Sequence, residues 1–199
     1  DVAAGGQGAP LVPAFHQAVF GQPGQDLAVL NVGGIANLSA LSAQGDAMGF
    51  DCGPGNALLD FWCQRHTGRP FDDAGAWAAS GQVHPALLAR LRQAPYFQQT
   101  PPKSTGRDLF NADWLAVQLT GFESVSAVDV QASLTALTAL TCAQDLRRHL
   151  PGAAQLLVCG GGALNTELMR QLALALPGVQ VLSTQARGLP PLQVEAAAF

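Results

Sequence analysis

The sequence predicts an α/β fold in which a three-stranded antiparallel meander is extended by parallel strands and flanked by helices. The first observation is a series of three short apolar runs joined by short turns within residues 27–51. The second is an apolar run followed by a glycine cluster and a helical pattern within residues 155–176. The 199 residues, 48% of them hydrophobic and 12% charged, suffice for one well-filled core.

The meander is expected to consist of strands over residues 27–31, 36–41 and 47–51. The pair Gly33-Gly34 fits a tight turn between the first two strands, and a short polar turn joins the second strand to the third. Short connections of this kind join antiparallel neighbours, so the three strands should lie side by side.

The remaining chain alternates helical patterns with two further strands, over residues 155–159 and 179–183. Residues 68–82 are expected to form a loop or short helix, and residues 94–105 an extended Pro-rich excursion. Helices are expected over residues 57–66, 85–93, 111–119, 130–150 and 166–176, and a last helix is expected to begin near residue 193.

Composition excludes two classes of partner. The formal net charge of -4 and the pI near 5.4 argue against nucleic acid, and no cluster of Lys and Arg with interleaved aromatics is present. No apolar run reaches the roughly 20 residues that cross a bilayer, so no membrane partner is expected. The four cysteines form no C-x-x-C pair, which predicts free thiols in a reducing cytoplasm.

The first catalytic candidate is Asp51, which lies on a loop just before a predicted helix. Gly53 and Gly55 permit unusual backbone angles, Pro54 stiffens the turn, and Asn56 is expected to cap the helix. A carboxylate held beside free backbone N–H groups at a helix start suits proton abstraction next to a phosphate. The alternative is a loop in which the Asp merely bonds its own turn.

Two more glycine clusters, Gly33-Gly34 and Gly160–Gly162, also follow predicted strands. Their backbone can approach a ligand closely. Neither cluster matches the phosphate-binding loop that ends in Gly-Lys-Ser/Thr, nor the Gly-x-Gly-x-x-Gly of dinucleotide folds. Three such loops at one end of a sheet predict a ligand site.

Basic and acidic residues outside these loops add weaker candidates. Lys103, Ser104 and Arg107 could hold an anion or a sugar, or could belong to a solvated loop. Asp1 precedes a Gly-rich stretch and could contact a sugar or support a hinge, or could only cap a turn.

The order of a meander, a helix and helix-flanked strands is that of a ribonuclease-H-like (actin-like ATPase) lobe. The chain also resembles the anhydro-N-acetylmuramic acid kinases, bacterial sugar kinases of the actin, hexokinase and heat-shock-70 ATPase superfamily. The matching motifs run from the first residue to the last. They occupy residues 1–16, 30–39, 49–56, 102–107, 158–165 and 194–199.

The resemblance implies a reaction of cell-wall (peptidoglycan) recycling in which ATP, water and 1,6-anhydro-N-acetylmuramic acid give N-acetylmuramic acid 6-phosphate and ADP. The anhydro bridge opens as O6 is phosphorylated, and the residue matching Asp51 activates the water that attacks C1. Mg²⁺ is implied because phosphoryl transfer from ATP requires neutralised phosphate oxygens. No metal ligand is assigned.

The resemblance also assigns binding residues. Cys52 stands where the family usually has Thr, and Leu192 stands where an acidic residue is common. Nucleotide-binding roles carry over to Asn31, Gly33, Gly34, Gly160, Gly161, Gly162, Asn165 and Glu195. Weaker substrate-binding roles fall on Asp1, Gly53, Gly55, Asn56 and Lys103.

Residues 1–199 are expected to form the C-terminal lobe of a two-lobed kinase, without the N-terminal lobe and the final tail, and to be inactive alone. The resemblance implies a homodimer. One alternative is a non-catalytic nucleotide-binding module, which would keep the glycine loops without requiring Asp51. Another is a kinase for a different amino sugar, in which a substrate hydroxyl loses its proton to Asp51. Opening of the anhydro ring distinguishes the two kinases.

Overall fold

The computed structural model describes residues 11–198, so Asp1 lies outside the described residues. Its sheet has the order β3-β2-β1-β4-β5. The pairs β1–β2 and β2–β3 are antiparallel, whereas β1–β4 and β4–β5 are parallel, which confirms the predicted meander with its parallel extension. The strands are β1 (Leu27–Val32), β2 (Ile35–Leu41), β3 (Ala47–Pro54), β4 (Gln155–Cys159) and β5 (Gln180–Ser183).

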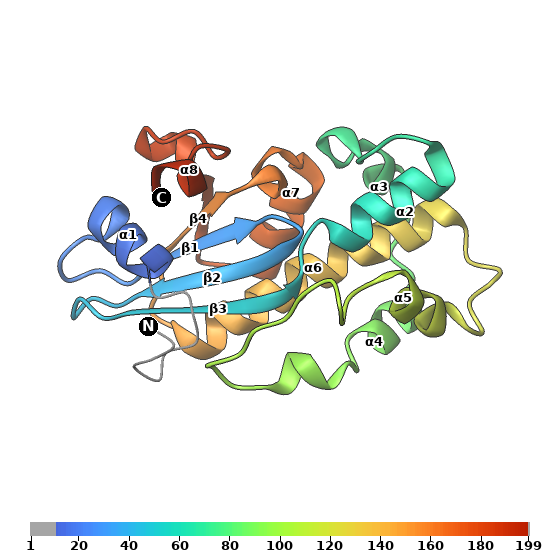
Figure 1. Ribbon diagram of the computed structural model, residues 1–199, viewed down its shortest axis with the longest axis horizontal. Coiled ribbons are helices and arrows are strands. Elements are labelled where there is room, and N and C mark those ends of the chain that lie inside the picture. The colour runs from blue at the N-terminus through green and yellow to red at the C-terminus, as the bar shows by residue number, and fades with distance from the viewer. Residues whose placement is uncertain (1–10, 199) are drawn as a thin grey trace.

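The helices surround this sheet (Figure 1). Within residues 11–198, none of them is both long enough and apolar enough to cross a membrane. They are α1 (Leu11–Phe20), α2 (Ala57–Thr67), α3 (Ala76–Ser80), α4 (Pro85–Leu91), α5 (Ala112–Leu119), α6 (Ala127–His149), α7 (Thr166–Ala175) and α8 (Val194–Ala198). Short 3-10 turns lie at Asp73–Gly75, Pro95–Gln98, Gly161–Leu164 and Thr184–Arg187.

Two helices differ from the sequence-based expectation. Helix α1 was not predicted, and its Pro13 falls in the first turn, where a missing N–H is tolerated. Helix α6 begins at Ala127, three residues earlier than expected, because Ser126 Oγ accepts a hydrogen bond from the Asp129 amide at 3.2 Å.

The sheet carries helices on both faces. Helices α6 and α7 cover one face, where Leu30, Leu38 and Val158 meet Leu146 and Leu172 in the main core. Helices α1 and α8 lie on the opposite face, over a smaller core. That core contains Phe20, Leu27, Val29, Leu41, Leu157, Cys159 and Val194.

A separate helical cluster packs on the N-terminal half of α6. Helices α2, α4 and α5 close over buried aromatic and aliphatic side chains there, among them Trp62, Phe97 and Phe110. Gly68 ends α2 with a left-handed φ of 74°, a conformation that glycine adopts readily. The long segment between α2 and α5 is thereby tied to the same helix that supports the sheet (Figure 1).

Candidate active site

The three glycine loops lie at one end of the sheet. Strands β1 and β4 run parallel, with Asn31 opposite Cys159, so their carboxyl ends meet. Strand β3 ends beside the start of β2, where Pro54 pairs with Ile35. Since β1 and β2 are joined directly by the pair Gly33-Gly34, all three loops surround the same edge. This is the edge at which ligands bind in many open α/β sheets.

The glycine loops contact one another through their backbones. The amide of Gly55 donates to the Gly34 carbonyl at 3.0 Å, and the amide of Asn56 donates to the Gly33 carbonyl at 2.8 Å. A Cβ at Gly55 would collide with the Gly33 carbonyl oxygen, so glycine is required here for close approach. The unusual backbone angle expected at Gly55 is absent, whereas Gly53 has a φ of 145°.

These contacts correct the expectation of free amides beside Asp51. The amides of Gly55, Asn56 and Ala57 at the start of α2 all donate to carbonyls of Gly33 or Gly34. A phosphate would therefore not find these three donors unoccupied. At the start of α2, the chain therefore forms backbone contacts with the Gly33-Gly34 turn instead of an open anion cradle.

Asn56 also differs from its expected role. It has helical angles, φ -84° and ψ -13°, and its side chain caps no amide of α2. A capping side chain normally requires an extended backbone at that residue. Its Nδ2 instead donates to the Val32 carbonyl at 3.1 Å and would lie 3.4 Å from a Cβ at Gly161. Asn56 thus connects the β3–α2 loop with the ends of β1 and β4.

A row of polar residues crosses the sheet beside these loops. Asp51 on β3 is opposite Asn37 on β2, and Asn37 is opposite Asn31 on β1. Opposed residues share one face of a sheet. Side chains alternate along a strand, and Phe50 and Cys52 belong to the core beneath α6, so this row faces the side that carries α1 and α8.

The carboxylate of Asp51 is held by another segment of the chain. Its Oδ2 accepts hydrogen bonds from Ser104 Oγ at 3.0 Å and from the Thr105 amide at 2.9 Å. The Asp51 amide donates to the Lys103 carbonyl at 3.2 Å, and the Tyr96 hydroxyl donates to the Asp51 carbonyl at 2.8 Å. The alternative in which Asp51 bonds its own turn is therefore wrong. Among residues 11–198, no hydrogen-bond donor meets its Oδ1.

Lys103 is not available to a ligand through its side chain. Its ammonium is 1% exposed and lies 2.8 Å from Asp145 Oδ2 on α6. The nitrogen also lies 5.1 Å from the Tyr96 ring centroid and 5.7 Å from that of Phe50. The expectation of a sugar contact by this side chain is therefore wrong, because the Pro-rich segment directs Lys103 into the core.

The other end of the polar row contacts the last helix. Asn31 Nδ2 donates to Glu195 Oε1 of α8 at 2.8 Å, and Asn31 Oδ1 is buried without a hydrogen-bond partner in the described chain. Gly160 has a φ of 75°, and a Cβ there would collide with Asn31 Oδ1. Burial and the nearby Glu195 raise the pKa of the Cys159 thiol to about 12. Asn31 and Glu195, two nucleotide-binding candidates far apart in the sequence, are therefore in direct contact.

Asn165 is engaged in local structure. Its Oδ1 accepts a hydrogen bond from the Leu168 amide at 2.9 Å and so caps α7. The same oxygen packs against Gly75, where a Cβ would overlap it. Any contact of this side chain with a nucleotide therefore has to use its Nδ2.

An exposed cation lies against the first glycine turn. A Cβ at Gly34 would lie 3.1 Å from Nη2 of Arg107, and Arg107 belongs to neither ion pair found among the described residues. Burial raises the pKa of Asp60, on the first turn of α2, to about 6, and the Arg107 charge opposes that rise. The Gly33-Gly34 turn therefore has a guanidinium beside it.

The two positions that depart from the family pattern lie outside the polar row. Cys52 is fully buried beside Cys142, and burial raises the pKa of its thiol well above the ordinary value. Its side chain points away from the Asp51 carboxylate, because the two are neighbours on one strand. Leu192 is 62% exposed.

The residues at this edge are compatible with an Mg²⁺ ion whose ligands are mainly phosphate oxygens. Within residues 11–198, no group of three His, Cys, Asp or Glu side chains could hold a metal by itself. Mg²⁺ in nucleotide sites typically uses one or two carboxylates together with phosphates and water. Asp51 is partly exposed, with one oxygen unpaired within residues 11–198, and Glu195 is exposed, so this edge offers carboxylates of that kind.

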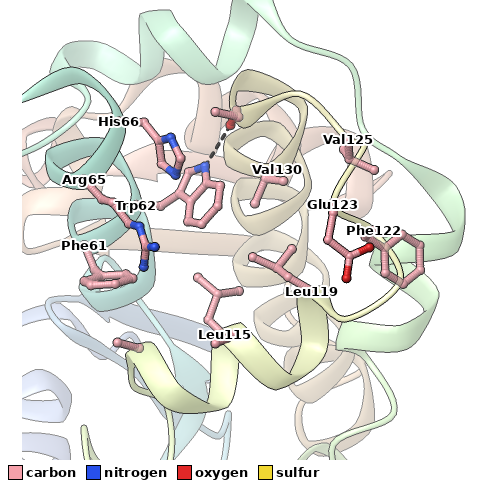
Figure 2. A pocket seen from close by; sticks show the side chains of 13 residues that line it. Phe61, Trp62, Arg65, His66, Leu115, Leu119, Phe122, Glu123, Val125 and Val130 are labelled. Atoms are coloured by element: carbon pink, nitrogen blue, oxygen red, sulfur yellow. Dashed lines mark hydrogen bonds between the residues drawn. The ribbon is translucent and has the colours of Figure 1, made fainter.

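A cavity of about 270 Å³ lies elsewhere, between α2, α5 and the start of α6. Figure 2 shows Phe61, Trp62 and Leu115 forming its walls, with Arg65 and Glu123 at its rim. None of the predicted site residues lines it. We therefore place the candidate active site at the glycine loops and not in this cavity.

Sequence reasoning did not identify three residues that shape the site. Asn37 lies between Asp51 and Asn31, and an Asn inside an apolar strand was the available signal. Tyr96 contacts the Asp51 carbonyl, and Thr138 Oγ1 lies 3.1 Å from the Pro54 carbonyl, to which it donates. Neither contact has a local sequence signal, because 45 and 84 residues separate the partners.

Comparison with known proteins identifies a family that this chain matches. A family model described as anhydro-N-acetylmuramic acid kinase matches residues 1–199. Proteins named anhydro-N-acetylmuramic acid kinase from Albidiferax ferrireducens and Variovorax paradoxus are 58% and 60% identical over 219 and 204 residues. All of this chain matches, but it spans only 56% and 54% of those relatives, about half their length.

Two solved structures share the fold at low identity. One is the activator of the 2-hydroxyisocaproyl-CoA dehydratase from Clostridium difficile with bound ADPNP, with a TM-score of 0.55 and 10% identity. The other is xylulose kinase from Rhodospirillum rubrum, with a TM-score of 0.53 and 16% identity. Each match covers 94% of this chain, and the matches cover 62% and 40% of the respective structures.

Proposed function

The chain belongs to the anhydro-N-acetylmuramic acid kinase family, and from this premise we propose the reaction of the protein that contains it. The proposed substrates are ATP, water and 1,6-anhydro-N-acetylmuramic acid, and the products are N-acetylmuramic acid 6-phosphate and ADP. The observation that supports this proposal best is the Asp51 carboxylate, which Ser104 and Thr105 hold in place, while its other oxygen has no partner in the described part of the chain.

Asp51 is the proposed general base. Its unpaired Oδ1 takes a proton from the water that attacks C1, while the C1–O6 bond opens and O6 receives the γ-phosphoryl group. A base must lie within hydrogen-bond reach of the proton it removes, and a fixed carboxylate satisfies this requirement without reorganisation. Asn37, the neighbour of Asp51 in the polar row, would orient the same water through its side-chain amide.

The nucleotide is proposed to lie along the remainder of the row. Gly33, Gly34 and Asn31 would face the phosphates, and Arg107 would bring positive charge to the same turn. Residues 160–162, with Asn165 and Glu195, would border the adenosine. When bound, Mg²⁺ neutralises charge on the phosphate oxygens, and Asp51 and Glu195 are the carboxylates at this edge that could contact it.

The remaining substrate contacts are proposed from the backbone. Gly53, Gly55 and Asn56 would shape the sugar side of the site through the rigid loop between β3 and α2. Asp1, outside the described residues, would contact the sugar or support a hinge.

We also propose that the chain is the C-terminal lobe of a two-lobed enzyme that acts as a cytoplasmic homodimer. The chain spans about half the length of its relatives, which supports its assignment as one lobe. The four cysteines are free and buried, in agreement with a reducing compartment.

The test is an assay of the full-length protein with MgATP and 1,6-anhydro-N-acetylmuramic acid, with the product identified by mass spectrometry. The parent should form the ring-opened 6-phosphate, and Asp51→Asn should reduce kcat about a hundredfold or more, because the general base is removed. Asp46→Asn, an exposed acid in the turn before β3, is the matched control and should retain activity.

Each other outcome has a defined meaning. A phosphorylated sugar with its anhydro ring intact would indicate a kinase for a different acceptor. Nucleotide binding without any phosphorylated sugar would support a non-catalytic nucleotide-binding module and contradict the proposal.

A further inference from the structure

We propose that the buried ion pair Lys103–Asp145 is the positioning element of Asp51. The inference rests on the proposed function, because it concerns the general base of that reaction. Lys103 and Asp145 would act through the segment 103–105, without touching substrate.

The first step is the path of contacts from α6 to the carboxylate. Asp145 on α6 binds the Lys103 ammonium at 2.8 Å. The next two residues, Ser104 and Thr105, supply the two donors to Asp51 Oδ2. The carbonyl oxygen of Lys103 itself accepts a hydrogen bond from the Asp51 amide at 3.2 Å. Every contact that this segment makes with Asp51 thus comes from the anchored residue itself or from the two residues after it.

The second step is the burial of the pair. Both side chains are almost fully buried, at 1% and 2% exposure, and Asp145 Oδ1 has no other partner among residues 11–198. Removing two charges from water is costly, and apolar side chains of similar size often give equal or greater stability. An apolar pair could supply the same stability, but it would not fix the position of segment 103–105 relative to α6.

The third step is the environment of the ammonium. Tyr96 and Phe50 flank it, with ring centroids 5.1 Å and 5.7 Å from the nitrogen. The Tyr96 hydroxyl also donates to the Asp51 carbonyl at 2.8 Å. The aromatic ring that confines Lys103 therefore also restrains the backbone of Asp51. The lysine, the tyrosine and the catalytic carboxylate consequently form one connected unit.

The consequence for catalysis is specific. If segment 103–105 were loosened, Asp51 would stay on β3, but its carboxylate would be free to rotate away from the water that attacks C1. Misplacement of a catalytic group by about 1 Å can reduce the rate by about a hundredfold. Nucleotide affinity should be unaffected, because the ammonium faces the core and not the glycine loops.

The test compares two single variants with a double variant of the full-length enzyme. Lys103→Met and Asp145→Asn each leave one buried group without its partner and should lower the melting temperature. The double variant Lys103→Met/Asp145→Leu leaves no unpaired charge, so its melting temperature should recover. Its kcat should nevertheless stay at least about tenfold below the parent value, with KM for ATP unchanged.

A second measurement does not depend on activity. Hydrogen–deuterium exchange should show the amides of Asp51 and Thr105 exchanging at least about tenfold faster in the double variant. Leu172→Ala, on the buried side of α7, is the control with lowered stability and should leave exchange in segment 103–105 and kcat unchanged at a temperature where it is folded.

The results separate this inference from the proposed function. Parent kcat and parent exchange rates in the folded double variant would overturn the positioning role and leave the reaction standing. An inactive parent enzyme would overturn the reaction, while the exchange rates would still decide whether the ion pair holds Asp51.

Discussion

Asn31 on the first strand donates a hydrogen bond of 2.8 Å to Glu195 on the last helix, across 164 residues of sequence. Asn31 is 5% exposed, whereas Glu195 is exposed. The bond fixes α8 against the end of β1, beside the Gly160 loop. The side of the site proposed for nucleotide is therefore built from both ends of the described chain.

Glu195→Ala is expected to weaken nucleotide binding about five- to tenfold. The change leaves a buried Asn31 Nδ2 without its acceptor, at a cost of about 1 kcal/mol or more. Isothermal titration of the full-length enzyme with a non-hydrolysable ATP analogue measures the effect. Gln193→Ala, an exposed neighbour, is the control. Equal affinity in Glu195→Ala and the parent would show that the bond does not shape the nucleotide site.

Gly160→Ala is expected to destabilise the protein by about 2 kcal/mol more than Gly178→Ala. Both glycines have a positive φ, 75° and 88°, that L residues rarely adopt, and the ψ of -177° at Gly160 lies in a region almost confined to glycine, so backbone strain adds to the loss at Gly160. Only Gly160 is crowded, because a Cβ there would collide with Asn31 Oδ1, whereas a Cβ at Gly178 meets nothing within 4 Å. Urea unfolding of both variants measures the difference, and equal losses would refute the crowding argument.

The protein is expected to lose stability in mild acid because His16 is buried. Burial lowers the pKa of His16 to about 4, from an unfolded value of 6.5. As pH falls from 6.5 towards 4, the unfolded chain binds a proton that the native state rejects, so the free energy of unfolding decreases. The loss is about 2 kcal/mol between about pH 7 and pH 5.

The measurement is urea unfolding of the parent and of His16→Asn at both pH values. The variant loses the hydrogen bond of 2.9 Å between His16 Nδ1 and Ser39 Oγ, so its stability at pH 7 should be lower. Between pH 7 and pH 5, the free energy of unfolding of the variant should decrease by about 2 kcal/mol less than that of the parent. The same slope in both proteins would show that another group titrates.

The sheet topology and the location of Asp51 were predictable because their signals are local. Alternating apolar runs and short turns specify the meander, and a glycine loop beside an acid identifies Asp51. The occupied amides, the side chain of Asn56 and the burial of Lys103 were not predictable. Each depends on a partner at least about twenty residues away in sequence, such as Val32 for Asn56 and Asp145 for Lys103.

Helix α6 binds the segment 82–103 at several separate points along its length. Its side chains form hydrogen bonds with the backbones of Gln82, His84 and Phe97 and with the ammonium of Lys103. The stretch between His84 and Phe97 is therefore bounded by fixed attachment points. Within it, Leu91 and Tyr96 are buried and Tyr96 binds the Asp51 carbonyl, whereas Arg92 and Gln93 are exposed. An insertion beside Arg92 and Gln93 should therefore alter the outline of the molecule while leaving Asp51 where it is, so this is where related chains can diverge in length at least cost.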